Sequence, residues 1–169
     1  MNLLVTGGCG FIGSNFIRLA LSKGEVKRLV NVDKMTYAAD IANTKYPSNQ
    51  DRSFQDDSRY HHEILCLTDY QGFKEICVKN EITDIVHFAA ETHVDNSIKG
   101  SRVFIESNVV ATHSILETCK EKDIRLHHIS TDEVYGEVLG SDRFNENSYY
   151  NPKNPYSATK AASEHLVRA

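Results

Sequence analysis

The sequence has no long run of basic residues and no apolar stretch of the ~20 residues that a membrane helix needs. Its formal net charge is −4, which disfavours binding to nucleic acid or to an anionic membrane surface. The opening MNLLVTGG is too short and too uncharged for a secretory signal. We therefore expect a cytoplasmic protein that binds neither nucleic acid nor membrane, with the composition of an ordinary globular domain.

The sequence also lacks the cysteine and histidine spacings of metal sites. The cysteines form no CxxC pair and have no histidine at zinc-finger spacing. The histidine doublets at 61–62 and 127–128 fall in predicted strands, where adjacent side chains face opposite sides of a sheet. We predict no metal site, and four reduced, buried thiols: Cys9, Cys66, Cys77 and Cys119.

Short apolar runs alternate with segments of helical period, and no repeats or low-complexity tracts appear. Strands are predicted at 2–6, 28–33, 61–67, 84–88 and 124–131, and helices at 12–23, 70–79, 102–121 and from about 156. Loops are predicted at 43–59 and 137–154. This alternation predicts an α/β fold with a doubly wound parallel sheet, the Rossmann architecture, as one domain over 1–169. The last helical pattern runs to the end of the sequence without a cap, so we expect a fragment of a longer protein.

A glycine-rich motif, 7-GGCGFIG-13, follows the first predicted strand and opens a helix. Gly7, Gly10 and Gly13 permit a tight turn whose N–H groups can approach a pyrophosphate, and the helix start favours its negative charge. Asp33 ends the next strand, where a carboxylate can accept the ribose hydroxyls of NAD and would repel the 2′-phosphate of NADP. The small residues Ala89 and Ala90, after the fourth strand, leave room for the cofactor. The motif predicts a dinucleotide site.

Tyr156 and Lys160 are four residues apart on the last predicted helix, so their side chains share a face. An ammonium near a phenol favours the phenolate and lowers the pKa of the tyrosine, which could then act as a base toward a substrate alcohol. Thr131, Asp132 and Glu133 follow the fifth strand, at the edge of the sheet where ligands bind in open α/β folds. Alone, this acidic pair reads as a solvated strand end or a helix cap.

Five segments together resemble the extended short-chain dehydrogenase/reductase family, and within it the nucleotide-sugar 4,6-dehydratases, most of all those acting on a dTDP sugar. These segments are TGGCGFIGSN (6–15), DKMTYA (33–38), HFAAETHVDNS (87–97), STDEVYG (130–136) and NPYSATKAASE (154–164). The resemblance covers the whole chain. The Asp–Glu pair after Thr131 separates it from epimerases of the same family.

The resemblance implies a lyase reaction in three parts. Tyr156, supported by Lys160, removes the 4-hydroxyl proton of the sugar while NAD is reduced, and Thr131 can hydrogen-bond the reacting hydroxyl of the substrate. Glu133 then takes the proton from carbon 5 as general base, and a protonated Asp132 gives its proton to the leaving 6-hydroxyl. Return of the hydride to carbon 6 regenerates the cofactor. The Tyr–Lys pair thus serves the redox steps and the acidic pair the elimination.

The resemblance also assigns the remaining site residues and a homodimer. His93 is expected to approach the substrate. The cofactor is expected to touch Gly7, Gly10, Phe11, Ile12, Gly13, Asp33, Lys34, Thr36, Ala89, Ala90, Thr92 and Ser107. Cys66 stands where the family usually has an adenine-contacting Asp, which puts that contact in doubt. The carboxyl-terminal sugar-nucleotide domain of such enzymes is absent from the sequence.

Two other interpretations stay open. The chain could belong to a dehydratase for a UDP or GDP sugar, because the residues that select the base lie outside it. It could also be a cofactor-binding module without turnover of its own.

Overall fold

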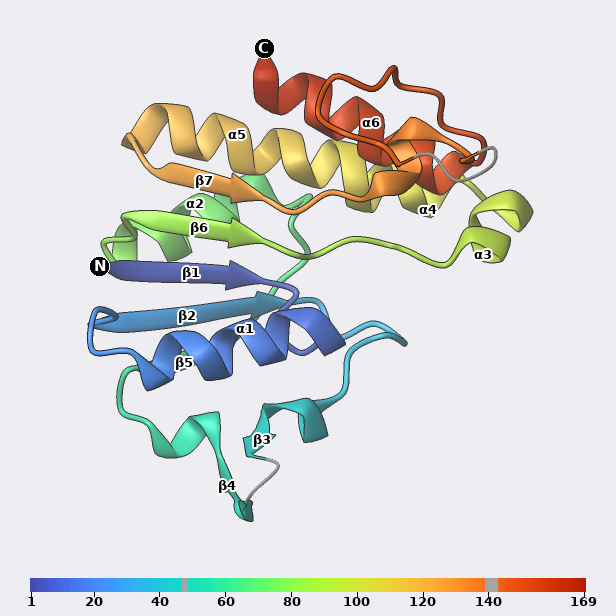
Figure 1. Ribbon diagram of the computed structural model, residues 1–169. Coiled ribbons are helices and arrows are strands. Elements are labelled where there is room, and N and C mark those ends of the chain that lie inside the picture. Colours follow the sequence, from blue (N-terminus) through green and yellow to red (C-terminus); the bar gives the residue numbers. More distant parts are fainter. Residues whose placement is uncertain (47–48, 139–142) are drawn as a thin grey trace.

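The computed structural model describes residues 1–46, 49–138 and 143–169. Its centre is a sheet of five parallel strands in the order β5-β2-β1-β6-β7 (Figure 1). The strands are Asn2–Thr6 (β1), Arg28–Asp33 (β2), Tyr60–Ile64 (β5), Asp84–His87 (β6) and Arg125–His128 (β7). The strand order reverses between β1 and β6, as in a doubly wound fold, and all carboxyl ends share one edge. The predicted fold class is confirmed.

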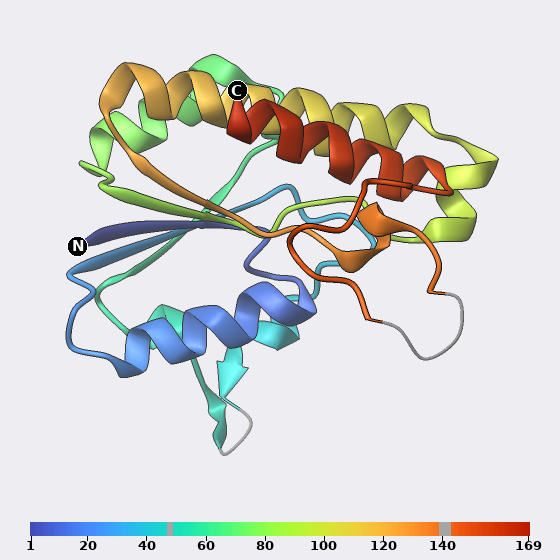
Figure 2. The same cartoon turned by 45° about the horizontal axis from the view of Figure 1, so that its top comes forward.

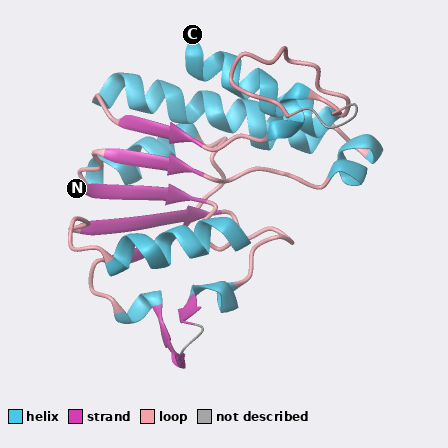
Figure 3. Cartoon of the chain, viewed as in Figure 1, coloured by secondary structure: helices cyan, strands magenta, loops and turns pink. Residues whose placement is uncertain are grey.

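Helices cover both faces of this sheet, as Figures 2 and 3 show. One face carries α1 (Phe11–Ser22), and the other carries α2 (Tyr70–Lys79), α5 (Ala111–Lys122) and α6 (Pro155–Arg168). The shorter helices are η1 (Ile41–Thr44), η2 (Phe54–Asp56), α3 (Val94–Lys99), α4 (Arg102–Phe104), η3 (Ile105–Val110) and η4 (Asp132–Tyr135). Within the described ranges, no helix combines the length and apolarity that a membrane span requires.

The core lies in two layers because successive residues of a strand face opposite sides of the sheet. On β1, Leu4 packs in a cluster with Phe73 of α2 and Ile115 of α5. Its neighbour Leu3 packs on the other face with Ile17 of α1. Each side chain buried in this way contributes about 1.5–3 kcal/mol to stability, and together the layers fix the strand ends that carry the site.

The segment 43–59 is not the solvated loop that its composition predicts. It contains a short antiparallel pair, β3 (Lys45–Tyr46) with β4 (Asn49–Ser53). The Phe54 side chain is fully buried, and its ring lies 5.4 Å from that of Tyr60 in an edge-on arrangement. This one aromatic residue anchors a polar segment to the core on the α1 side of the sheet.

Other boundaries also depart from the sequence patterns. The later strands end before their predicted limits, and α3 was not predicted. The helix predicted at 102–121 is present, but a π-helical turn interrupts it. Of the loop predicted at 137–154, residues 139–142 lie outside the described residues.

The π-helical turn places Asn108 as a clamp between two other segments. Its side chain donates to the main-chain oxygen of Glu91 (3.0 Å) and accepts from the Glu91 N–H (2.8 Å). The hydroxyls of Thr112 and Ser163 both donate to the Asn108 main-chain oxygen at 2.6 Å, which satisfies a carbonyl in the widened turn. The loop after β6 is therefore held against α6.

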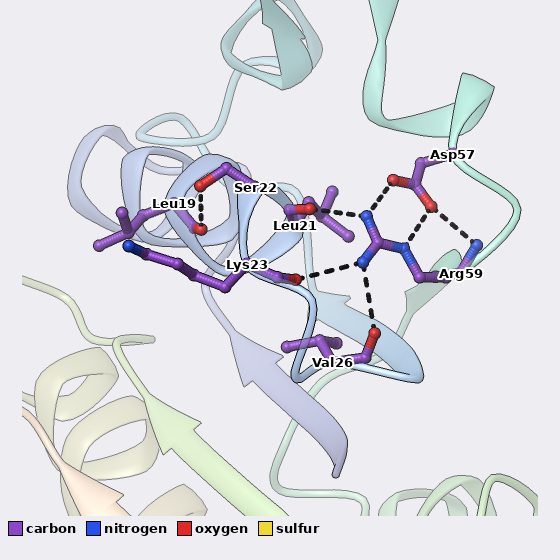
Figure 4. A network of polar contacts seen from close by, with 7 residues as sticks. All are labelled: Leu19, Leu21, Ser22, Lys23, Val26, Asp57 and Arg59. Atoms are coloured by element: carbon purple, nitrogen blue, oxygen red, sulfur yellow. Dashed lines mark hydrogen bonds and ion pairs between the residues drawn. The ribbon is translucent and has the colours of Figure 1, made fainter.

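Arg59 closes the carboxyl end of α1 (Figure 4). Its guanidinium donates to the main-chain oxygens of Leu21 (2.6 Å), Val26 (3.3 Å) and Lys23 (3.4 Å). Asp57 accepts two further bonds from the same group, at 2.9 and 2.6 Å, and this lowers the pKa of its carboxyl. One planar cation thus satisfies carbonyls that the end of a helix leaves without partners.

Replacing Arg59 by glutamine should lower the free energy of unfolding by about 1–3 kcal/mol, since several carbonyls lose a charged donor. Urea denaturation followed by circular dichroism measures the change. The matched control is Arg102→Gln, because Arg102 is highly exposed and pairs with Glu106 one turn away; its effect should stay within about 0.5 kcal/mol. Equal losses in the two variants would contradict the assigned role.

Candidate functional site

The turn between β1 and α1 has no room for side chains at its first and last glycines. A Cβ on Gly7 would lie 2.7 Å from the N atom of Ala89, and Gly7 has a φ of +70°. A Cβ on Gly13 would lie 2.3 Å from the Gly7 oxygen. Backbone therefore packs against backbone where the chain leaves β1. No side chain caps the start of α1, so its first N–H groups can bind an anion.

Gly8, which the sequence reasoning did not single out, is equally constrained. Its N–H donates to Asn31 Oδ1 at 3.0 Å, and a Cβ there would lie 2.2 Å from the same atom. Asn31 also donates to the Tyr60 hydroxyl at 3.0 Å. The signal in the sequence is an asparagine inside the apolar run RLVNVD, because a buried amide needs polar partners.

The thiols divide into inert and accessible ones. Burial raises the pKa of Cys9 to about 11, of Cys77 to about 12 and of Cys119 to about 11, so these thiols stay protonated at neutral pH. The expectation of burial is wrong for Cys66, which is exposed and lies in the wall of the cavity described below.

Asp33 is held by main-chain donors at the end of β2. Its carboxylate accepts from the N–H of Cys9 (3.0 Å) and from the N–H of Met35 (2.9 Å), one on each oxygen. Met35 adopts a left-handed conformation with φ 57°, which turns the chain back over the carboxylate. The carboxylate orientation is thus fixed by the fold, and each oxygen keeps a lone pair for a further donor.

A cavity of about 350 Å³ opens at the carboxyl edge of the sheet. Its walls include every residue that the sequence suggested for the cofactor: Gly7, Gly10, Phe11, Ile12, Gly13, Asp33, Lys34, Thr36, Ala89, Ala90, Thr92 and Ser107. Further walls come from Leu65, Cys66, Leu67 and Thr68 after β5, a segment for which the sequence had suggested only the altered Cys66 contact. The convergence follows from the parallel sheet, which brings the ends of β1, β2, β5 and β6 to one place.

Tyr156 and Lys160 both line this cavity, one turn apart on α6. The Lys160 ammonium donates to the main-chain oxygen of Ile129 at 2.6 Å. Burial lowers the pKa of Lys160 to about 8, although the nearby Glu164 carboxylate works in the opposite direction. Lys160 can therefore lose its proton close to neutral pH.

The pKa of Tyr156 is shifted in the direction opposite to that expected from the Tyr–Lys spacing. Burial raises it, and so do the carboxylates of Glu133 and Asp132, whereas a hydrogen bond with Thr131 lowers it. Lys160 is not among the influences on this pKa, and its ammonium donates to the main-chain oxygen of Ile129 in the loop after β7. Spacing alone could not foresee the desolvation of the phenol.

The depressed pKa of Lys160 predicts a contribution to stability that grows at alkaline pH. Between about pH 8 and 10.5 the unfolded chain binds this proton and the folded chain does not, so the Lys160 contribution to the free energy of unfolding increases with pH across that window, by up to about 3 kcal/mol. Subtracting the stability profile of Lys160→Met from that of the unsubstituted chain isolates this contribution. Lys120→Met, at an exposed position on α5, should keep the pH profile of the unsubstituted chain. If the free energies of unfolding of the unsubstituted chain and of Lys160→Met differ by the same amount at every pH, the lowered pKa of Lys160 is contradicted.

Thr131, Asp132 and Glu133 lie beside the phenol but outside the cavity walls. Thr131 caps η4, accepting from the Glu133 N–H at 3.3 Å, and Asp132 and Glu133 form the first turn of η4 rather than the cap itself. Asn154, which caps α6, donates to Glu133 Oε2 at 3.0 Å. The sequence reasoning missed Asn154, which ties the acidic turn to the helix that carries Tyr156.

His93 and Glu164 both lie outside the described cavity walls. The His93 ring caps α3, with Nδ1 accepting from the Asn96 N–H at 3.4 Å, and it is exposed outside the cavity walls. The Glu164 carboxylate, which the sequence reasoning also missed, accepts from the hydroxyls of Ser130 and Tyr150. The sequence feature that could have pointed to Glu164 is its spacing of four residues from Lys160, which places both side chains on one face of the helix.

Comparison with protein families gives a match over residues 4–169 to the model described as GDP-mannose 4,6 dehydratase. Among curated proteins, the chain is 44% identical to the dTDP-glucose 4,6-dehydratase of Mycolicibacterium smegmatis and 41% identical to that of Haemophilus influenzae. Each alignment covers all of this chain but only 48% and 51% of the relative. The chain thus spans about half the length of the curated relatives it matches.

Solved structures of similar proteins share the fold over nearly the whole chain. The dTDP-glucose 4,6-dehydratase of Streptomyces venezuelae, crystallised with NAD, aligns with a TM-score of 0.90 and 37% identity, over 99% of this chain and 51% of its own. The UDP-glucose 4-epimerase of Thermus thermophilus, also with NAD, aligns with a TM-score of 0.85 and 29% identity, over 99% and 50%.

Proposed function

Because the chain belongs to the GDP-mannose 4,6-dehydratase family, we propose that it is the NAD-binding and catalytic part of a dTDP-glucose 4,6-dehydratase. The observation that carries this proposal is one cavity that joins the glycine turn, Asp33 and the Tyr156–Lys160 pair, with Glu133 next to the phenol. Relatives with this activity, at 38–44% identity, favour the dTDP sugar.

The residues present fit NAD. The crowded glycine turn and the uncapped start of α1 suit a pyrophosphate, and the oriented carboxylate of Asp33 suits the ribose hydroxyls. Lys34, Thr36, Ala89, Ala90, Thr92 and Ser107 would complete the contacts. When bound, NAD would accept a hydride from carbon 4 of the sugar and give it back to carbon 6.

The redox steps need a base for the 4-hydroxyl proton, and Tyr156 is the group placed for it. Thr131 stabilises the phenolate form by donating a hydrogen bond, and this is the influence that lowers the pKa of Tyr156. Lys160, with a pKa of about 8, can hold or release a proton near neutral pH. The two side chains can therefore pass a proton between the sugar oxygen and the cavity.

The elimination step needs a second acid–base pair, which Glu133 and Asp132 supply. Glu133 takes the proton on carbon 5, made acidic by the 4-ketone, and Asn154 orients its carboxylate. Asp132 gives a proton to the 6-hydroxyl, which leaves as water. His93 is proposed to contact the sugar from α3.

The test combines binding and turnover. Isothermal calorimetry should show NAD binding to the chain, and incubation with dTDP-glucose should form the 4-keto-6-deoxy product. NAD binding without product would support the alternative of a cofactor-binding module. No binding of NAD would refute the proposal. The homodimer, the cytoplasmic location and the domain limits stay predictions.

A second candidate is a dehydratase for another nucleotide sugar, because the matching family model takes its description from GDP-mannose. Running GDP-mannose and UDP-glucose beside dTDP-glucose separates the candidates. Faster turnover of either competitor would replace the dTDP sugar as the assigned substrate.

A further inference from the structure

The Lys34 side chain, next to Asp33 at the end of β2, is already engaged by the protein. Its ammonium donates to Ser107 Oγ at 2.7 Å and lies 3.6 Å from Glu91 Oε1. Lys34 and Ser107 are both cavity walls. The Glu91 side chain is only 9% exposed and that of Lys34 is 33% exposed, so the carboxylate of this ion pair is largely shielded from solvent.

Glu91 is fixed in place from several sides. Its main chain is clamped by Asn108 in both directions. Its carboxylate also hydrogen-bonds with the Tyr37 hydroxyl, which bonds to Asn96 of α3 as well. A buried carboxylate requires such partners, and the Lys34 ammonium is the cation that balances its charge.

The charges at this end of the cavity are unfavourable for a further anion. Among the described residues that line the cavity, the cations are Lys34 and Lys160, and Lys160 lies on α6 beside Tyr156. Lys34 has the Glu91 carboxylate as its ion-pair partner, and Asp33 precedes it in the chain. In dinucleotide sites of this fold, a cation near the end of the second strand is what accommodates the 2′-phosphate of NADP.

We propose that Glu91 is a specificity-determining residue: by holding the Lys34 ammonium, it withholds that cation from a 2′-phosphate and so favours NAD over NADP. Asp33 repels the 2′-phosphate directly, and Glu91 engages the Lys34 ammonium that could otherwise balance the charge of that phosphate. The inference rests on the proposed nucleotide site and adds a second residue to its selectivity.

The experiment measures dissociation constants for NAD and NADP by calorimetry on the 169-residue chain. Glu91→Gln removes the carboxylate charge but keeps the main-chain hydrogen bonds to Asn108. It should reduce the preference for NAD over NADP by about fivefold, which corresponds to the upper end of the interaction free energy of a partly exposed ion pair. The change in the ratio should come from tighter NADP binding. This increase in NADP affinity should disappear in the double variant Glu91→Gln/Lys34→Gln, because the released cation is Lys34.

Two comparisons keep the result specific. Glu25→Gln makes the same chemical change at an exposed position away from the cavity, and the ratio should not move. Lys34→Gln alone should change the ratio by less than about twofold, because Glu91 already holds that ammonium. This second variant tests the inference even if Glu91→Gln does not fold.

The outcomes separate the two levels of the argument. An unchanged ratio in a folded Glu91→Gln chain that still binds NAD overturns the inference and leaves the nucleotide site standing. A loss of NADP binding in Lys34→Gln that clearly exceeds the loss of NAD binding also overturns it, since Lys34 would then already serve the phosphate. If the unsubstituted chain binds neither nucleotide, the nucleotide site itself fails and the inference falls with it.

Discussion

Gly13→Ala is expected to abolish NAD binding and to lower the free energy of unfolding by about 1–3 kcal/mol. The added methyl would lie 2.3 Å from the Gly7 oxygen and 3.0 Å from the Gly8 Cα. Both neighbours are backbone atoms of the turn itself, so no flexible side chain can move aside. The turn must open, which displaces the N–H groups at the start of α1 that we assign to the pyrophosphate.

Gly24→Ala provides the matched control, because a Cβ there meets no atom within 4 Å. This variant should keep NAD binding and change the unfolding free energy by less than about 0.5 kcal/mol. Calorimetry and urea denaturation on the two variants measure both effects. A Gly13→Ala chain that binds NAD as tightly as the Gly24→Ala chain would mean that the turn is not the phosphate site.

The central elements of the fold could be predicted because single residues mark their ends. The first two strands, 2–6 and 28–33, have the predicted limits, since Gly7 and Asp33 end apolar runs too short for a helix. The helix at 70–79 also matches. Parallel strands bring their carboxyl ends together, and this placed the glycine turn, Asp33 and the two alanines at one edge. The other predicted cavity walls, from Phe11 to Ser107, came from the family resemblance.

The parts that sequence reasoning missed depend on contacts between distant segments. Phe54 lies in a polar segment, and only its packing against Tyr60 reveals a buried position. The π-helical turn at Ile105–Val110 is stabilised by hydroxyls of Thr112 and Ser163, the second of them on another helix. No local period encodes such partners.

The electrostatics of the site were harder to foresee than its composition. The spacing of Tyr156 and Lys160 placed both in the cavity, yet the pKa of the phenol moves upward because burial and two carboxylates outweigh the other influences. Desolvation depends on how completely the surrounding segments cover a group. That coverage is a property of the folded chain and not of a motif.

Glu133→Gln is expected to lower the rate of dehydration of dTDP-glucose by about 10²–10⁴-fold. An amide cannot take the proton from carbon 5, whereas the base for the 4-hydroxyl, Tyr156, is unchanged. The substitution is nearly isosteric, and the new amide oxygen can still accept from Asn154 Nδ2, which lies 3.0 Å from Glu133 Oε2. The acidic turn should therefore keep its position, and the loss should be chemical rather than structural.

Two measurements distinguish elimination from oxidation in this variant. Formation of the 4-keto-6-deoxy product and exchange of the carbon 5 proton with deuterium oxide should both fall, while the absorbance of reduced nicotinamide persists after dTDP-glucose is added. Glu137→Gln, an exposed carboxylate four residues further on, is the matched control and should dehydrate the sugar at the unsubstituted rate. If Glu133→Gln dehydrates the sugar at that same rate, Glu133 is not the base for the carbon 5 proton, because another group must then remove this proton just as fast.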